Sequence, residues 1–352
     1  MIEYKEQFKK YLQKIGSGQL TSHALSREES AKALKLMLQA KATPAQIGAF
    51  MIAHRIRRPE PQELAGMIDT YRELGPKLLS QKGQSRPICF GMPLDGRNRT
   101  APIYPLTTLI LVSTGLPVVL HGGQRMPIKY GVTTAELFEV LGLQLKGLTI
   151  NQVQNCFDET GLALIHQPDH FVLAERMTSY RDELGKRPPL ASMELIWTAH
   201  QGEHLLVSGF VHPPTEERAR KTLELMGEQN LISVKGLEGS TDLPTNRACI
   251  TGRVIGSEFE RIILHPREHK YSGKDVEWTN LVQWRHDALE ALRNRGPLQK
   301  SLIWNAGVYL WLSGIVNSLG NGLDKAEESL IAGSAMTTLE QLITWTSNAQ
   351  KT

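Results

Sequence analysis

The sequence predicts an α/β protein with a small all-α N-terminal domain and a larger α/β domain. Helical periodicity runs from about residue 4 to residue 75, and short apolar strands alternate with helices from Ile88 onwards. The chain has 352 residues, 41% of them hydrophobic and 22% charged, which is enough for a large core and more than one domain.

Domain boundaries follow from these patterns. The helical domain is predicted for residues 1–80, with punctuation at Gly16-Ser17-Gly18 and Thr43-Pro44, and the α/β domain for residues 85–148 and 185–352. Residues 149–184 return to a helical pattern. The strand candidates are Ile88–Phe90, Pro117–Leu120, Leu205–Gly209, Leu231–Val234 and Arg261–Leu264.

A glycine-rich basic loop follows the strand predicted at Leu116–Leu120. Gly122 and Gly123 permit close approach of backbone N–H groups to a ligand, and Arg125 and Lys129 bring positive charge to the same loop. Together these groups favour a phosphate, a pyrophosphate or a carboxylate. An ordinary turn between strand and helix, with solvated basic side chains, is the alternative.

A capped helix is predicted directly after this loop. Thr133 fits an N-cap, Glu136 completes a capping box three residues later, and Gly142 fits the end of the helix. The N-terminus of the helix therefore faces the loop, and its dipole also favours an anion there.

Four separated segments resemble the anthranilate phosphoribosyltransferase family. They are the loop at His121–Arg125, the Pro-x-Gln-x-Gly-Ala-Phe element at Pro44–Phe50, RDELGKRPPL at Arg181–Leu190 and NAGVYLWLSG at Asn305–Gly314. The resemblance implies that family's nucleoside phosphorylase-like fold. It also implies that residues 149–184 pack back on the helical domain and leave a cleft between the two domains.

In that family the cleft binds phosphoribosyl pyrophosphate, so the resemblance implies a phosphorylated small molecule as ligand. Gly91–Pro105 corresponds to the diphosphate loop, but Met92, Pro93 and Leu94 replace small residues there, and Pro93 has no amide proton. Arg97 and Arg99 offer charge instead. The predicted phosphate- or substrate-binding residues are Gly91, Asp95, Gly96, Arg97, Arg99, Thr100, His121, Gly122, Gly123, Arg125, Lys129 and Arg181.

The resemblance also implies Mg²⁺. Members of the family hold it with adjacent acidic residues after a strand, whereas this chain has Glu238 and Asp242 separated by Gly-Ser-Thr. These two carboxylates are the predicted metal ligands. Arg181 matches the arginine that meets the acceptor's carboxylate. If the protein is an enzyme, it is therefore expected to be a magnesium-dependent phosphoribosyltransferase-type glycosyltransferase.

The departures occur together, and in them the chain is closer to the YbiB-type transferase-like paralogues of the family. That likeness implies a homodimer that binds DNA or RNA without sequence preference. Such binding requires clustered basic residues. The run from His54 supplies Arg55, Arg57 and Arg58, for which a solvated helix end is the alternative.

Two functions therefore stay open, a phosphate-ligand site in the cleft and a non-catalytic nucleic-acid-binding dimer. A net charge of +4 permits anionic partners without requiring nucleic acid. Three scattered cysteines make neither a disulfide framework nor a zinc pattern, which favours a cytoplasmic location. No membrane partner is expected, since the apolar stretches are interrupted and the charged N-terminus is unlike a signal peptide.

Overall fold

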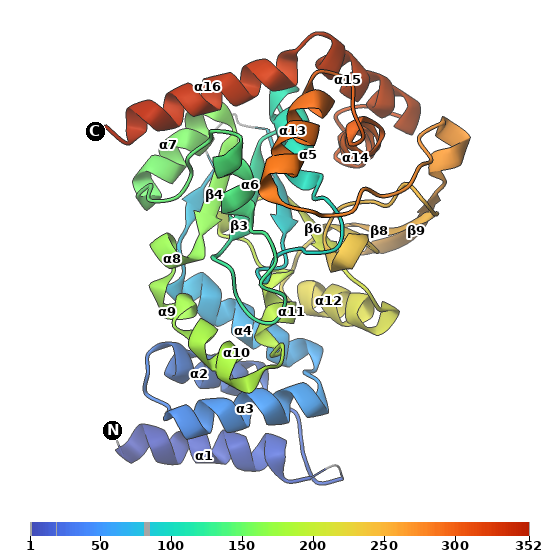
Figure 1. Cartoon of the computed structure of the whole chain (residues 1–352). Helices are drawn as coiled ribbons and strands as arrows, with labels where there is room; N and C mark the ends of the chain where they lie inside the picture. Colours follow the sequence, from blue (N-terminus) through green and yellow to red (C-terminus); the bar gives the residue numbers. More distant parts are fainter. Residues whose placement is uncertain (1, 19, 81–84, 352) are drawn as a thin grey trace.

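The N-terminal domain is a helical bundle. The computed structural model describes residues 2–18, 20–80 and 85–351 (Figure 1). The helices of the bundle are α1 (Ile2–Gly16), α2 (Arg27–Leu38), α3 (Pro44–Arg57) and α4 (Pro61–Leu74). Ser26 caps α2 in a capping box with Glu29, and Thr43 caps α3 in the same way with Gln46. The predicted small all-α domain is confirmed.

The larger domain is built on a mixed sheet. Its strands are β2 (Ile88–Gly91), β3 (Val118–Gly122), β4 (Leu162–His166), β6 (Leu205–Gly209), β7 (Asn230–Val234), β8 (Cys249–Ile255) and β9 (Glu258–Leu264). They lie in the order β4-β3-β2-β6-β7-β8-β9, parallel as far as β7 and antiparallel from β7 to β9. Strands β2, β3, β4 and β6 are buried along their whole length, as expected for parallel strands covered on both faces.

Helices cover this sheet (Figure 1). They are α5 (Tyr104–Ser113), α6 (Thr134–Val140), α7 (Ile150–Thr160), α12 (Pro213–Leu225), α13 (Leu281–Leu292), α14 (Gln299–Leu312), α15 (Leu319–Ile331) and α16 (Ser334–Ala349). Helices α14 and α15 pack closely because Gly307 faces Gly322, where an added Cβ on Gly322 would lie 2.2 Å from the Gly307 oxygen. The ring of Tyr309 on α14 meets Phe90 of β2 edge-on at 5.1 Å, so the C-terminal helices share the core of the sheet.

Short elements join the bundle to the sheet. Strands β1 (Leu78–Leu79) and β5 (His200–Gln201) pair with each other, and α8 (Gln167–His170), α9 (Val172–Glu175), α10 (Met177–Leu184) and α11 (Leu190–Glu194) follow β4. Helix α10 contacts α3, and both α11 and α12 contact α4. Two 3₁₀ turns, Leu237–Gly239 and Pro266–His269, complete the structure. No helix in the described part of the chain is both long and apolar enough to cross a membrane.

The predicted strands all occur, but two others of the seven-stranded sheet were missed, as were the short paired strands β1 and β5. Strand β4 lies within residues 149–184, where the sequence predicts helix, because the apolar run LALIH after Gly161 pairs with β3 in the interior. Strand β8 was missed because glycine, arginine and threonine break its apolar pattern, CITGRVI.

The order of the strands identifies a crevice. From β2 the chain continues through β3 and β4 on one side of the sheet, and later through β6 and β7 on the other. The carboxyl ends of β2 and β6 therefore lie at the point where the order reverses, which is where open α/β sheets bind ligands. The loops after β2, β3 and β7 carry most of the predicted site residues.

Candidate functional site

The loop after β2 turns its backbone N–H groups towards Glu238. The Glu238 carboxylate accepts hydrogen bonds from the backbone nitrogens of Arg99 and Thr100, each at 3.0 Å, and of Asn98 at 3.3 Å. Gly96 allows this course, since its φ is +73° and an added Cβ would lie 2.5 Å from the oxygen of Gly131. These N–H groups therefore bind an anion that belongs to the protein.

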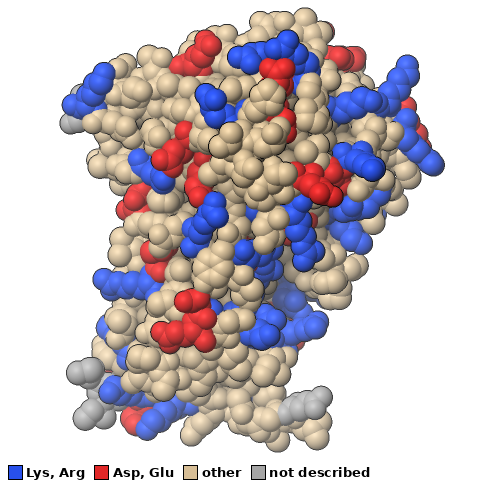
Figure 2. All heavy atoms as spheres, viewed as in Figure 1, with Lys and Arg blue, Asp and Glu red and all other residues tan. Residues whose placement is uncertain are grey.

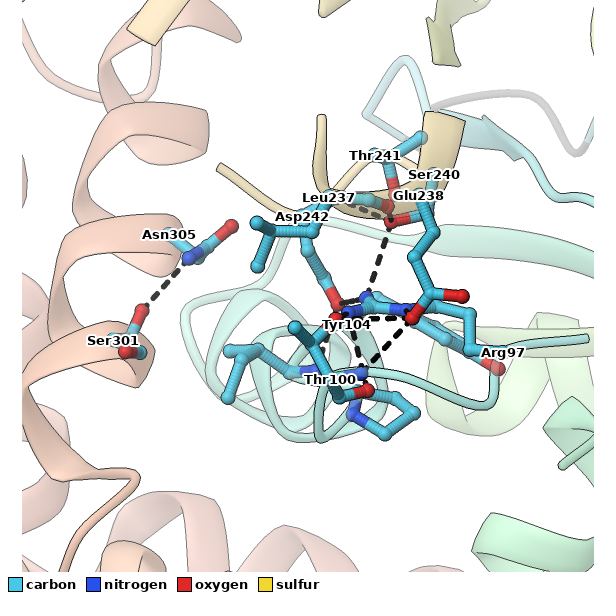
Figure 3. A network of polar contacts seen from close by, with 12 residues as sticks. Arg97, Thr100, Tyr104, Leu237, Glu238, Ser240, Thr241, Asp242, Ser301 and Asn305 are labelled. Atoms are coloured by element: carbon cyan, nitrogen blue, oxygen red, sulfur yellow. Dashed lines mark hydrogen bonds and ion pairs between the residues drawn. The ribbon is translucent and has the colours of Figure 1, made fainter. Parts of the chain in front are cut away.

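Arg97 is buried between this carboxylate and Asp242 (Figure 3). Its guanidinium bonds to the carboxylate of Asp242 and to the hydroxyl of Thr100, and donates to the Ser240 Oγ at 3.1 Å. Its Nε lies 3.5 Å from Glu238. Both arginine and aspartate are only 1% exposed. The predicted phosphate ligand Arg97 thus faces inward and pairs with both predicted metal ligands.

The chain fixes Asp242 from two further sides. The backbone nitrogen of Ile103 donates to its carboxylate at 2.9 Å. Asn305 on α14 exchanges hydrogen bonds with the backbone of Leu243, at 2.7 Å and 3.1 Å. Burial raises the pKa of Glu238, but the charge of Arg97 and the N–H groups of Thr100 and Arg99 outweigh it, so the pKa is lowered overall. Glu238 is therefore an anion at neutral pH.

The two carboxylates do not fit a divalent metal as they stand. Mg²⁺ requires oxygen ligands close around the ion, and these oxygens already bind Arg97 and backbone N–H groups. Within the described residues, no group of three or more His, Cys, Asp or Glu side chains is arranged to hold a metal. A metal at this position would have to displace the guanidinium.

The loop after β3 encloses little space. The cavity that Gly122 and Gly123 line with Met92, Pro93 and Thr134 has a volume of about 10 Å³, roughly the space of one water molecule. Gly91 ends β2 where an added Cβ would lie 1.9 Å from the Leu195 oxygen, so its role in the fold is close packing.

The predicted N-cap Thr133 and its capping box with Glu136 are confirmed at the start of α6. Arg125 pairs with the same Glu136 at 2.8 Å, on the surface. His121 is buried, and burial lowers its pKa to about 4, so it is neutral at pH 7. Neither Arg125 nor His121 lines the small cavity at Gly122–Gly123.

Arg181 also has a partner from the chain itself. Its guanidinium binds both oxygens of the Glu194 carboxylate, and the Tyr71 hydroxyl donates to the same carboxylate at 3.3 Å. All three side chains are buried. An acceptor carboxylate at Arg181 would have to replace Glu194.

Two larger cavities lie outside this buried region. The bundle cavity, of about 770 Å³, lies between the helical bundle and the N-terminal end of α12, and is lined by Arg55, Arg58, Arg187, Arg218, His212 and several prolines. The loop cavity, of about 540 Å³, is lined by Arg99, Lys129, Arg187, Lys235, Arg247, Asn98, Ile128, Val211, Gly236 and Glu238. Arg187 borders both. Figure 2 shows basic side chains gathered right of centre on this face.

Several of the lining cations have no side-chain partner in the described part of the chain. Arg58, Arg99 and Lys235 make no side-chain hydrogen bond or ion pair with any described residue. Arg187 pairs with Asp95, while Lys129 lies 3.8 Å from Glu238. Burial lowers the pKa of Lys129, and the positive charges of Arg187 and Arg97 lower it further.

The structure separates the predicted nucleic-acid residues. Arg55 and Arg58 line the bundle cavity, whereas Arg57 is bonded to the buried carboxylate of Glu63. Among the cations that the sequence analysis missed, Lys235 had a usable signal, since it directly follows β7. Arg187 stands in the segment Arg181–Leu190 that resembles the family, and Arg247 had no local signal, because the path of its loop brings it to the cavity.

Comparisons with known proteins agree along almost the whole chain. Residues 9–75 match the helical bundle domain of a glycosyl transferase family, and residues 97–336 match the α/β domain of that family. The anthranilate phosphoribosyltransferase of Chromobacterium violaceum is 26% identical over 92% of this chain and 94% of its own length. That of Aromatoleum aromaticum is 24% identical over 90% and 92%.

Solved structures show the same fold. The anthranilate phosphoribosyltransferase of Thermus thermophilus superposes with a TM-score of 0.79 at 21% identity, covering 96% of this chain and 98% of its own. The enzyme of Saccharomyces cerevisiae in complex with PRPP and Mg superposes with a TM-score of 0.81 at 15% identity, covering 98% and 99%.

Proposed function

Since this chain belongs to the glycosyl transferase family of the anthranilate phosphoribosyltransferases, we propose that it binds a phosphorylated ligand through cations of the loop and bundle cavities. The proposal rests on three cavity-lining cations that have no side-chain partner among the residues that the structure describes. Arg58 faces the bundle cavity, and Arg99 and Lys235 face the loop cavity.

Charge is the first argument for a phosphate. The loop cavity gathers arginines and lysines around a single carboxylate, Glu238, whose oxygens are already bonded to backbone N–H groups. An anion there would relieve the repulsion between the cations. Arg99 offers the planar pair of donors that suits phosphate oxygens, and each charged hydrogen bond contributes about 1.5 to 3 kcal/mol.

Position is the second argument. The loop cavity is lined by residues that follow β2, β6 and β7, at the crevice where the strand order reverses. The predicted phosphate residues Arg99 and Lys129 both line it. In this proposal the ligand lies outside the small cavity at Gly122–Gly123, and Mg²⁺ has no part in its binding.

Anthranilate transfer is not part of the proposal. Arg97 is bonded to Asp242, Arg181 to Glu194, and the N–H groups of the loop after β2 to Glu238. We expect no turnover of anthranilate and phosphoribosyl pyrophosphate with Mg²⁺. Turnover at ordinary enzyme rates, about 1 to 1000 per second, would contradict this expectation.

Calorimetric titration with inorganic pyrophosphate and with phosphoribosyl pyrophosphate, both without Mg²⁺, tests the binding proposal. We expect binding by the wild-type protein and at least about tenfold weaker binding by the double variant Arg99→Ala/Lys235→Ala. Arg285→Ala, which changes an exposed arginine on α13 away from both cavities, is the matched control. Equal affinity of the double variant and the wild type would refute the proposal.

A nucleic acid is the second candidate ligand, favoured by the continuity of the two cavities through Arg187. Cations extend from the end of α3 to the loop after β7, so successive phosphates of one strand can be contacted. No Phe, Tyr or Trp is among the described residues that line either cavity, so base stacking has no platform there. The likeness to YbiB-type paralogues also supports this candidate, and a homodimer would repeat the cavities across its twofold axis.

Titration of a single-stranded oligonucleotide at several salt concentrations tests the second candidate. The logarithm of affinity should fall with the logarithm of salt at about −0.7 per phosphate contact. The double variant Arg55→Ala/Arg58→Ala should lower both the affinity and the slope. A flat salt response would exclude binding by phosphate contacts. Sedimentation analysis of the same samples tests the predicted homodimer.

A further inference from the structure

The loop of residues 97–103 is closed around two carboxylates. It contributes the guanidinium of Arg97 and backbone N–H groups, and the segment after β7 contributes Glu238 and Asp242 (Figure 3). This arrangement brings one cation and two anions of the chain together.

The donors of Arg97 are directed at acceptors of the chain. Nη1 meets Asp242 and Ser240, Nη2 meets the Thr100 oxygens, and Nε points to Glu238 at the longer distance of 3.5 Å. An arginine side chain has five N–H donors and is always charged in proteins, so its burial requires such partners.

The two carboxylates depend on Arg97 as much as Arg97 depends on them. Asp242 is 1% exposed and the Glu238 side chain 6% exposed. Without Arg97, Asp242 would be buried with no counter-charge and Glu238 would keep only Lys129, 3.8 Å away, which is strongly unfavourable. The cation is therefore required by the fold, and Arg97 provides it within the same loop.

We propose that the Arg97 guanidinium is a built-in cation that takes the place of a divalent metal between Glu238 and Asp242, so that the protein excludes Mg²⁺ from this position. Glu238 correspondingly serves as the built-in anion of the N–H groups of Arg99 and Thr100. The relative from Saccharomyces cerevisiae was solved with PRPP and Mg, whereas in this chain the protein supplies charges of both signs.

This inference is independent of the ligand proposed for the loop and bundle cavities. It is tested with metal alone, so its failure would leave the phosphate titrations unaffected. Mn²⁺ is the probe, since its electron paramagnetic resonance signal reports the free ion. Wild-type protein should leave that signal unchanged at equimolar, sub-millimolar concentrations. Binding by the wild type that is lost in Asp242→Asn would overturn the proposal.

Removing the arginine should create the site that it fills. Arg97→Ala should bind Mn²⁺ at least about tenfold more tightly than the wild type, and Mn²⁺ should raise its melting temperature by at least about 2 °C. The double variant Arg97→Ala/Asp242→Asn is the control, and should lose both effects. A folded Arg97→Ala protein that binds no more Mn²⁺ than the wild type would also overturn the proposal.

Two further measurements cover the case in which Arg97→Ala does not fold alone. Refolding of this variant with Mn²⁺, but not in metal-free buffer, would support the substitution of metal for guanidinium. Arg97→Lys keeps one positive charge at the position and should bind no Mn²⁺. Binding of Mn²⁺ by this folded variant, lost when Asp242→Asn is added, would show that a side-chain cation does not exclude the metal.

Discussion

Arg97 and Arg99 stand two positions apart in the same loop, yet they belong to regions with opposite electrostatics. Arg97 lies in a buried network in which it bonds to Asp242 and approaches Glu238. Arg99 lines the loop cavity without a side-chain partner among the described residues. The comparison teaches that two neighbouring basic residues of one loop can differ in role, since Arg97 is bound within the fold and Arg99 is directed to a cavity.

Two other arginines are, like Arg97, paired with buried carboxylates. Arg181 pairs with Glu194 and Arg57 with Glu63, in each case with a carboxylate that is almost fully buried. Substitutions of these pairs should therefore act on stability, whereas substitutions in the two cavities should act on binding.

The largest effect is expected at Arg181. Arg181→Met would leave the Glu194 carboxylate buried without its counter-charge, and should lower the free energy of unfolding by about 3 to 5 kcal/mol. Denaturant titration measures this loss. Adding Glu194→Leu should recover much of it, because the uncompensated charge is then removed. If Arg181→Met is as stable as the wild type, buried arginine pairs do not differ from cavity arginines in their effect on stability.

Glu63 should make the stability of the protein depend on pH in the acid range. Burial raises its pKa, but His54, whose Nε2 lies 3.3 Å from the Glu63 carboxylate, and the bonded Arg57 outweigh burial and lower it from 4.5 to about 2. Because the pKa of the folded state is below that of the unfolded state, the carboxylate stabilises the protein fully above pH 4.5, and this stabilisation is lost as the pH falls towards 2. The loss is about 3 kcal/mol.

Unfolding of Glu63→Gln as a function of pH checks this assignment. The variant should be less stable at neutral pH and should show a flatter decline between pH 4.5 and 2. Parallel declines for variant and wild type would show that the acid sensitivity arises at other carboxylates.

Substitutions in the cavities should leave stability nearly unchanged. Arg58→Ala and Arg99→Ala should each change the free energy of unfolding by less than about 0.5 kcal/mol. Pyrophosphate binding by Arg99→Ala should weaken by about 1.5 to 3 kcal/mol, since a charged hydrogen bond is removed. Calorimetry and denaturant titration on the same samples separate the two effects. A large loss of stability in either variant would show that this arginine stabilises the fold, as is expected of Arg181 and Arg57.

The smallest effect is expected at Arg125. Its pair with Glu136 is on the surface, with the arginine 49% exposed, so Arg125→Ala should cost less than about 1 kcal/mol of stability. Its effect on phosphate affinity is the informative measurement. A loss comparable to that of Arg99→Ala would locate the anion at the Gly122–Gly123 loop, as the sequence analysis predicts.

Sequence patterns were sufficient where the interactions are local. The capping box of Thr133 and Glu136 was predicted because its signal lies within a few residues. For the same reason a strand was predicted at Pro117–Leu120, which the structure shows as β3 (Val118–Gly122). The direction of Arg97 was not predictable in this way. Its partners Ser240 and Asp242 come more than a hundred residues later, and only the pairing of β2 with β6 and of β6 with β7 brings the two loops together.

The position of Arg187 has a consequence for how ligands would influence each other. Arg187 borders both cavities, and its backbone oxygen accepts a hydrogen bond from Arg55 of the helical bundle. A phosphate that draws this side chain to one cavity changes the charge available in the other. Thermodynamic linkage then requires the effect to be reciprocal: the factor by which a first ligand alters the affinity for a second equals the factor in the opposite order. If both cavities bind phosphate, one shared arginine would therefore couple them.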